Sequence, residues 1–338
     1  MNLRNYLRAG YPAVAVVTPE ESRAQGAIIA SAAQVSASGD HRVYSWSPTM
    51  GVWDMTSHGE VDPKVTDPIA AIKYFTTKIP ERAIFVMYDF QLFLSSSNPN
   101  PILVRTIREA CAVLKQHQKC LVFLGCRISL PPELEKDIAI DEFKLPTAEE
   151  LGAVLDEVCT ETCGIPVITG DQRYLVLSAA AGLTTIEMEN VCCLSFAGSK
   201  TIDPAVIAAE KAKIIKKSGI LEIVHTDLNA DSIGGLEHLK AWIGRRRNAM
   251  TIKAREFGVP TPKGVLVVGI PGTGKSLVAK ASAAMLGCPL IRLDGGRIFG
   301  GIIGQSEANM RKVIETAEAC APCVLHIDEV NCFSLLAA

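Results

Sequence analysis

The sequence predicts an α/β fold, and three observations support this prediction. Apolar runs that suit buried strands alternate with helix-like segments over the first 145 residues. A glycine-rich loop stands between a strand-like and a helix-like segment near residue 270. A further apolar run ends in two adjacent carboxylates near residue 328. Strands that alternate with helices imply a parallel sheet with helices on its faces.

Composition indicates a globular protein without a bulk attraction to nucleic acid or anionic membranes. The chain has 338 residues, 48% apolar and 21% charged, with a formal charge of −2, so we expect two or three domains. No apolar run reaches the roughly 18 residues that span a bilayer, and the first residues lack the apolar centre of a signal peptide. We therefore expect no membrane partner and a cytoplasmic location.

The eleven cysteines are expected to be reduced thiols in such a compartment. Cys320 and Cys323 form a C-x-x-C, and Cys159 and Cys163 a C-x-x-x-C, but no complementary His or Cys pair completes a zinc site. We favour buried thiols over metal binding. For the basic group 245–247 we favour a solvated helix face over a nucleic-acid site.

Residues 1–145 are predicted to form a degenerate α/β domain without a phosphate loop. The predicted strands are Ala13–Val17, Ala83–Phe90 and Cys120–Cys126, with a helix over about 102–118 between the last two. After the first strand, the segment 18–21 offers acidic side chains where a phosphate would need N–H groups and a cation. This domain should not bind nucleotide, and we interpret Asp89, at the end of the second strand, as structural.

Residues 146–217 are predicted to form a helical, lid-like subdomain, and residues 218–338 a second α/β domain. Helix-start signals and apolar periodicity predict helices over Glu149–Cys159, Gln172–Ala181, Thr185–Phe196 and Pro204–Lys217.

A phosphate-binding loop is predicted in the second α/β domain. Val265–Val268 suits a strand buried on both faces, and Gly269–Ser276 matches G-x-x-x-x-G-K-[ST] without a mismatch. The glycines let backbone N–H groups converge on a phosphate, and a helix follows over Leu277–Leu286. The positive charge of Lys275 is repelled by the positive end of that helix's dipole. An anion bound at the same place would remove this cost. We therefore favour a phosphate site over a glycine-rich turn.

The complement to this loop is an acidic pair at the end of a strand. Val324, Leu325 and Ile327 predict a buried strand that ends in Asp328 and Glu329. Two adjacent carboxylates repel each other, and a divalent cation removes that cost. Asp328 can hold Mg²⁺ together with the Ser276 hydroxyl, while Glu329 can polarise an attacking water.

A phosphate loop alone fits several classes of protein, and four flanking stretches distinguish between them. These stretches are 231–237 (D-S-I-G-G-L-E), 257–264 (F-G-V-P-T-P-K-G), 303–311 (I-G-Q-S-E-A-N-M-R) and 321–329 (A-P-C-V-L-H-I-D-E). Together they resemble the AAA branch of the P-loop ATPases. Within that branch the chain is most similar to the hypothetical-chloroplast-frame AAA proteins of plastid and cyanobacterial genomes. This resemblance implies the plastid stroma as the location if the gene is plastid-encoded. The motifs span Ser232–Val330, and the likeness over 1–217 rests mainly on layout.

The resemblance implies an ATPase that uses ATP and Mg²⁺, acts as a homo-oligomer and remodels or regulates a protein partner. The implied catalytic residues are Lys275 and Glu329, and the implied metal ligands are Ser276 and Asp328. Near the adenine it implies Ile233, Gly234 and Gly235, and along the phosphates Pro271, Gly272, Thr273, Gly274, Lys275, Ser276 and Leu277. Family members that thread polypeptide carry an aromatic residue where this chain has Gly301 and Ile302, which favours remodelling or regulation.

The chain departs from the family after the acidic pair, where nine residues follow Glu329. The family continues with a further strand, an arginine finger and a helical lid. In the family's sheet this further strand lies between the acidic strand and the loop strand. We weigh a truncated or frameshifted reading frame, a split protein completed by another chain, and a product that binds nucleotide weakly. The alternative function is a hydrolysis-deficient nucleotide-binding or protein-interaction module.

Overall fold

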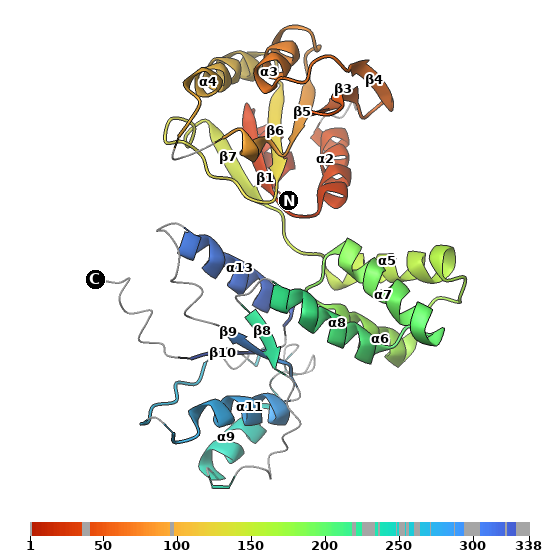
Figure 1. The fold of residues 1–338 in the computed structure, drawn as a ribbon, viewed down its shortest axis with the longest axis vertical. Coiled ribbons are helices and arrows are strands. Elements are labelled where there is room, and N and C mark those ends of the chain that lie inside the picture. The colour runs from red at the N-terminus through yellow and green to blue at the C-terminus, as the bar shows by residue number, and fades with distance from the viewer. Residues whose placement is uncertain are drawn as a thin grey trace. The chain divides into compact units, whose positions relative to one another are not determined.

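The computed structural model describes two compact units, Met1–Lys144 and Leu145–Ala338 (Figure 1). The described residues are 2–35, 41–94, 98–217, 221–224, 234–235, 237–247, 249, 254, 257–259, 264–270, 272–286, 288–293, 305–321 and 323–328. The helices after Leu145 and the second sheet fall within one unit.

The first unit is built on a seven-stranded sheet with the order β4-β3-β2-β5-β6-β1-β7. Strands β2, β5, β6, β1 and β7 are parallel, and β3 and β4 add an antiparallel edge. The bounds are β1 Ala13–Val17, β2 Arg42–Ser47, β3 Gly51–Asp54, β4 Gly59–Asp62, β5 Ala83–Tyr88, β6 Cys120–Gly125 and β7 Ile138–Glu142. The predicted parallel sheet is confirmed through β1, β5 and β6, whereas β2, β7 and the β3–β4 hairpin had no counterpart in the sequence-based prediction.

Helices cover both faces of this sheet, as the strand pattern predicts. Alternate strand residues pack against α1 (Leu3–Arg8) and α2 (Glu21–Val35) on one face. The other face packs against α3 (Pro68–Thr77) and α4 (Pro101–Gln116), and a short 3₁₀ turn, η1 (Phe90–Leu92), follows β5.

The starts of α3 and α4 follow from their sequences. The Asp67 carboxylate accepts a hydrogen bond from the Ala70 N–H at 2.7 Å, and the Asn100 side chain accepts one from the Ile102 N–H at 3.0 Å. Each cap is followed by a proline, whose fixed φ suits the first helical turn and whose missing N–H is not needed there.

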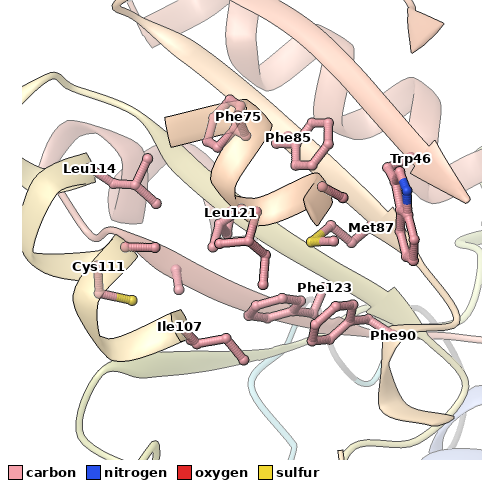
Figure 2. Close-up of a cluster of buried hydrophobic side chains, with 14 of the residues drawn as sticks. Trp46, Phe75, Phe85, Met87, Phe90, Ile107, Cys111, Leu114, Leu121 and Phe123 are labelled. Carbon is pink, nitrogen blue, oxygen red and sulfur yellow. The ribbon is translucent and has the colours of Figure 1, made fainter. Parts of the chain in front are cut away.

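Aromatic side chains fill the core beneath α3 and α4 (Figure 2). The Phe75 and Phe85 rings stack with centroids 4.7 Å apart, as do those of Phe90 and Phe123. The Trp46 indole N–H donates to the Val65 carbonyl at 2.7 Å, so its one polar atom is satisfied.

The second unit opens with a helical cluster. Its members are α5 (Ala148–Glu157), the π-helical turn η2 (Val158–Thr162), α6 (Gly170–Ala180), α7 (Thr185–Ser199) and α8 (Pro204–Lys217). Capping boxes at Thr147 and Thr184 begin α5 and α7. The four predicted helices are confirmed, and their buried side chains form a separate apolar core.

A three-stranded sheet follows, with the order β10-β9-β8. Strand β9 (Leu290–Leu293) is parallel to β10 (Val324–Ile327) and antiparallel to β8 (Leu221–Val224). Helix α9 (Glu237–Arg247) packs beside α11 (Lys275–Leu286), and α13 (Gln305–Ala319) leads back towards β10 (Figure 1). One face of the sheet packs with Val313 of α13 and Ile215 of α8 in an apolar core.

Among the residues that the structure describes, no helix combines the length and the apolar character that crossing a bilayer requires.

Candidate functional site

The glycine-rich loop turns sharply before α11. Gly272 and Gly274 have φ of +84° and +85°, a conformation that glycine adopts without steric cost. The Thr273 hydroxyl donates to the Ile270 carbonyl at 2.8 Å and closes the turn. A Cβ at Gly269 would meet that hydroxyl oxygen at 2.9 Å, so this position also favours glycine.

Lys275 is the first residue of α11, and its side chain folds back over the loop. Its Nζ donates to the carbonyls of Gly269 and Ile270, each at 2.9 Å. The ammonium group thus lies with the loop backbone, in an exposed position, at the positive end of a 12-residue helix. A lysine placed there is stabilised by an anion bound at the same helix end.

The predicted strand before the loop is wrong in the described structure. Residues 264–270 have no regular secondary structure, and Val265, Leu266 and Val268 are 54%, 77% and 85% exposed. A strand needs a hydrogen-bonded neighbour. The described sheet runs only from β8 to β10, and this segment pairs with none of its strands.

The acidic strand is confirmed as β10, which ends at Ile327, immediately before Asp328. Its predicted burial is wrong in the described structure, since its residues are only partly buried and Ile327 is exposed. Asp328 and Ser276, the two predicted metal ligands, line one cavity of about 620 Å³. Ser276 comes from the first turn of α11 and Asp328 from the end of β10. The structure therefore brings together two residues that are 52 positions apart in the sequence.

The rest of this cavity, which we call the α8–α11 cavity, is rich in basic side chains. Its charged and imidazole lining beyond the two predicted ligands consists of Lys213, Lys216, Glu222, Lys280, Arg292 and His326. Sequence reasoning missed these residues. The sequence spacing could have indicated two of them, because residues four apart on a helix or two apart along a strand share a face. Lys280 is four positions after Ser276, and His326 is two positions before Asp328.

The remaining predicted site residues lie either outside the described residues or at exposed positions. Ile233, Pro271 and Glu329 lie outside the described residues. Gly234 and Gly235 are exposed, and Gly235 has a φ of +75°, which glycine accommodates. Leu277 is partly exposed at the start of α11.

The corresponding edge of the first unit has acidic groups in place of a phosphate loop. Glu20 is buried and its carboxylate pairs with the Arg23 guanidinium at 2.8 Å. Burial and, to a lesser extent, Asp89 raise the pKa of Glu21. An additional anion at this edge would meet carboxylates, and the absence of nucleotide binding by this domain stays a prediction.

The cysteines of the C-x-x-C are packed in the apolar core of the second sheet. Cys320 is buried and Cys323 partly buried, and desolvation raises the pKa of both thiols, that of Cys323 to about 11. Such thiols are weak nucleophiles at neutral pH.

Two family models match the chain. Residues 1–143 match the N-terminal domain of SpoVK-like AAA ATPases, and residues 265–335 match the ATPase family associated with various cellular activities (AAA). The phosphate loop and the acidic strand end both fall within the second match. The match over 265–335 is the AAA likeness that the motifs predict, whereas the SpoVK-like match over 1–143 was not part of the sequence-based prediction.

Curated relatives agree with this assignment. The chain is 32% identical over 331 residues to the "Uncharacterized AAA domain-containing protein ycf46" of Trieres chinensis, a match that covers 96% of this chain and 64% of the relative. The protein of the same name from Guillardia theta is 34% identical over 331 residues, covering 96% and 63%. The chain therefore spans slightly less than two thirds of the length of these relatives.

A more distant similarity is confined to the ATPase region. "Cell division control protein 48 homolog C" of Arabidopsis thaliana is 36% identical over 108 residues, covering 31% of this chain and 13% of the relative. The predicted likeness to AAA ATPases and to the ycf46 proteins is confirmed.

Proposed function

We propose that this chain binds ATP with Mg²⁺ and hydrolyses it as an AAA-type ATPase. The observation that carries the proposal is the shared cavity of Ser276 and Asp328, at the helix end where Lys275 folds over a glycine-rich loop. The residues fit the ligand by their chemistry: N–H groups and an ammonium suit phosphate oxygens, and a hydroxyl with a carboxylate suits Mg²⁺.

Each residue has one role in the proposal. The loop amides and Lys275 hold the phosphates, while Ser276 and Asp328 hold Mg²⁺, which neutralises charge on the phosphate oxygens when bound. Glu329 orients and deprotonates the attacking water. That role rests on its position next to Asp328 and on the resemblance to the AAA family.

Phosphate release from ATP, with and without Mg²⁺, tests the proposal. We expect Mg²⁺-dependent release that Lys275→Ala abolishes, because the β- and γ-phosphates lose their cation. Lys217→Ala removes a lysine of α8 that does not line the cavity, so this control should release phosphate at the wild-type rate. No release above background, or equal release by wild type and Lys275→Ala, would count against the proposal.

A second candidate function is nucleotide binding without hydrolysis, as part of a protein-interaction module. The unpaired segment before the loop favours it, since nothing in the described sheet holds the loop rigidly beside β10. Equilibrium titration with ATP separates the two functions. Lys275-dependent binding with no phosphate release would support the module and reject the ATPase.

We further propose that the active form is a homo-oligomer, or a complex with a complementing chain, and that the ATPase remodels or regulates a protein partner. The similarity to AAA proteins supports this proposal. Sedimentation of the purified chain with and without ATP tests the assembly. A monomer under both conditions would reject the homo-oligomer.

A further inference from the structure

A row of polar side chains crosses the second sheet on the face opposite its apolar core. Glu222 of β8 is the cross-strand neighbour of Arg292 of β9, which in turn neighbours His326 of β10. The next row, Ile223, Ile291 and Leu325, belongs to the apolar core. Because side chains alternate across a sheet, the polar row faces the α8–α11 cavity, which all three of its residues line.

Glu222 forms ion pairs with two cations, Arg292 in this row and Lys216 outside it. Its Oε2 accepts from Arg292 Nη2 at 2.7 Å, and its Oε1 lies 3.5 Å from Lys216 Nζ. One carboxylate thus partners two cations, one on the sheet and one on α8, the last helix of the helical cluster. The ion pairs link that cluster to the strands that carry the candidate site.

The same cavity contains the proposed metal ligands. Ser276 and Asp328 line it together with Lys216, Lys280 and Arg292. Within the described part of the chain, Lys280 has no carboxylate partner. An anion that enters from the Ser276 end therefore meets a cationic wall whose charge Glu222 partly neutralises.

We propose that Glu222 is an internal competitor of the anionic ligand. The bound anion draws Arg292 and Lys216 away from Glu222, and this exchange loosens the attachment of α8 to the sheet. The inference rests on the proposed function and adds its regulation, since it couples occupancy of the phosphate site to the helical cluster.

The expected effect is modest because the groups are partly exposed. Arg292 is 54% and Glu222 36% exposed, and ion pairs of this kind change equilibria by about two- to fivefold. High salt should reduce the effect further, since it screens exposed charges.

Titration of the full chain with ATP and Mg²⁺ at low salt tests the competition. Glu222→Gln should bind ATP about threefold more tightly than wild type, because Arg292 and Lys216 lose their competing carboxylate. Glu189→Gln, which removes an equal charge from the exposed side of α7, should bind as wild type does. Equal or weaker binding by Glu222→Gln would overturn the inference.

A double-mutant cycle shows whether the gain passes through Arg292. In an Arg292→Gln background, Glu222→Gln should no longer tighten ATP binding. A gain that persists there would be a general charge effect and would reject the specific competition. Near-ultraviolet circular dichroism of each variant shows that it is folded.

Hydrogen exchange supplies the second readout. In wild type, ATP should raise amide exchange in the last turn of α8, and in Glu222→Gln that exchange should already be high without ATP. Unchanged exchange in both would overturn the coupling. If wild type binds ATP through Lys275 and Glu222→Gln changes nothing, only this inference fails. If wild type binds no ATP, both it and the proposed function fail.

Discussion

Lys119, Lys211 and Lys275 each donate to backbone carbonyls, but they differ in their access to water and ligands. Lys119 is buried and donates to the carbonyls of Phe75, Thr76 and Ile79 near the end of α3. Buried Lys211 donates to the Ala181 carbonyl, and desolvation lowers its pKa. Lys275 makes similar bonds in an exposed loop. Water and ligands can reach only Lys275 readily, so it can exchange carbonyl partners for phosphate oxygens.

At the residue scale, the acidic edge of the first unit gives a pH-dependent prediction. Burial and, to a lesser extent, the charge of Asp89 raise the pKa of Glu21. A carboxyl group with a raised folded-state pKa contributes stability that is present below its unfolded pKa and is lost as pH rises through the folded value. Glu21→Gln should therefore be more stable than wild type at pH 7, and the difference should vanish near pH 4.

Urea unfolding midpoints at the two pH values provide this measurement. Glu135→Gln serves as the charge-matched control, because Glu135 is exposed in the same unit. A stabilisation by Glu21→Gln that is equal at pH 4 and pH 7 would show that ionisation of Glu21 is not its cause.

At the element scale, two glycines of the first unit should respond oppositely to the same substitution. Gly51, which begins β3, has a φ of +69°, and a Cβ there would lie 2.5 Å from the Asp62 carbonyl oxygen. Gly26 lies within α2, where a Cβ would meet nothing within 4 Å. Gly51→Ala should cost about 2 kcal/mol or more, whereas Gly26→Ala should gain about 0.5–1 kcal/mol.

Chemical unfolding of the two variants tests the β3–β4 edge directly. Each variant is the control for the other, since the added atoms are identical. No loss of stability from Gly51→Ala would contradict the described backbone of β3, and a loss from Gly26→Ala would contradict the open space described beside α2.

The elements also show what sequence reasoning could reach. Strands such as Ala13–Val17 were predicted with correct bounds because a continuous apolar run reports burial on both faces. The same argument failed for Val265–Val268, because strand formation also depends on a neighbouring strand, and the run itself carries no information about that neighbour. The β3–β4 hairpin was missed since its strands are short and only partly apolar.

The candidate site was likewise predictable only in part. Lys275, Ser276 and Asp328 stand in motifs whose chemistry can be identified locally. Arg292 and Glu222 could not be found that way, because their place beside the site arises from the register between β8 and β9, which no local pattern specifies.

At the scale of the whole molecule, the first unit has the parts of an independent domain. Its sheet is covered on both faces, and its two apolar cores are composed of residues before Leu145. A fragment of residues 1–144 should therefore unfold cooperatively in urea, with the near-ultraviolet signal of packed Trp46 and Phe90. A gradual transition without that signal would show that this unit depends on the rest of the chain.

The central claim is that the glycine-rich loop and the end of β10 serve one nucleotide and its metal. The most direct test is the change in ATP affinity that Mg²⁺ produces, measured by titration calorimetry for wild type, Ser276→Ala and Asp328→Asn. Mg²⁺ should tighten ATP binding by wild type, and this gain should be largely lost in both variants, because each removes one metal contact. A gain from Mg²⁺ that is the same in all three proteins would contradict the account.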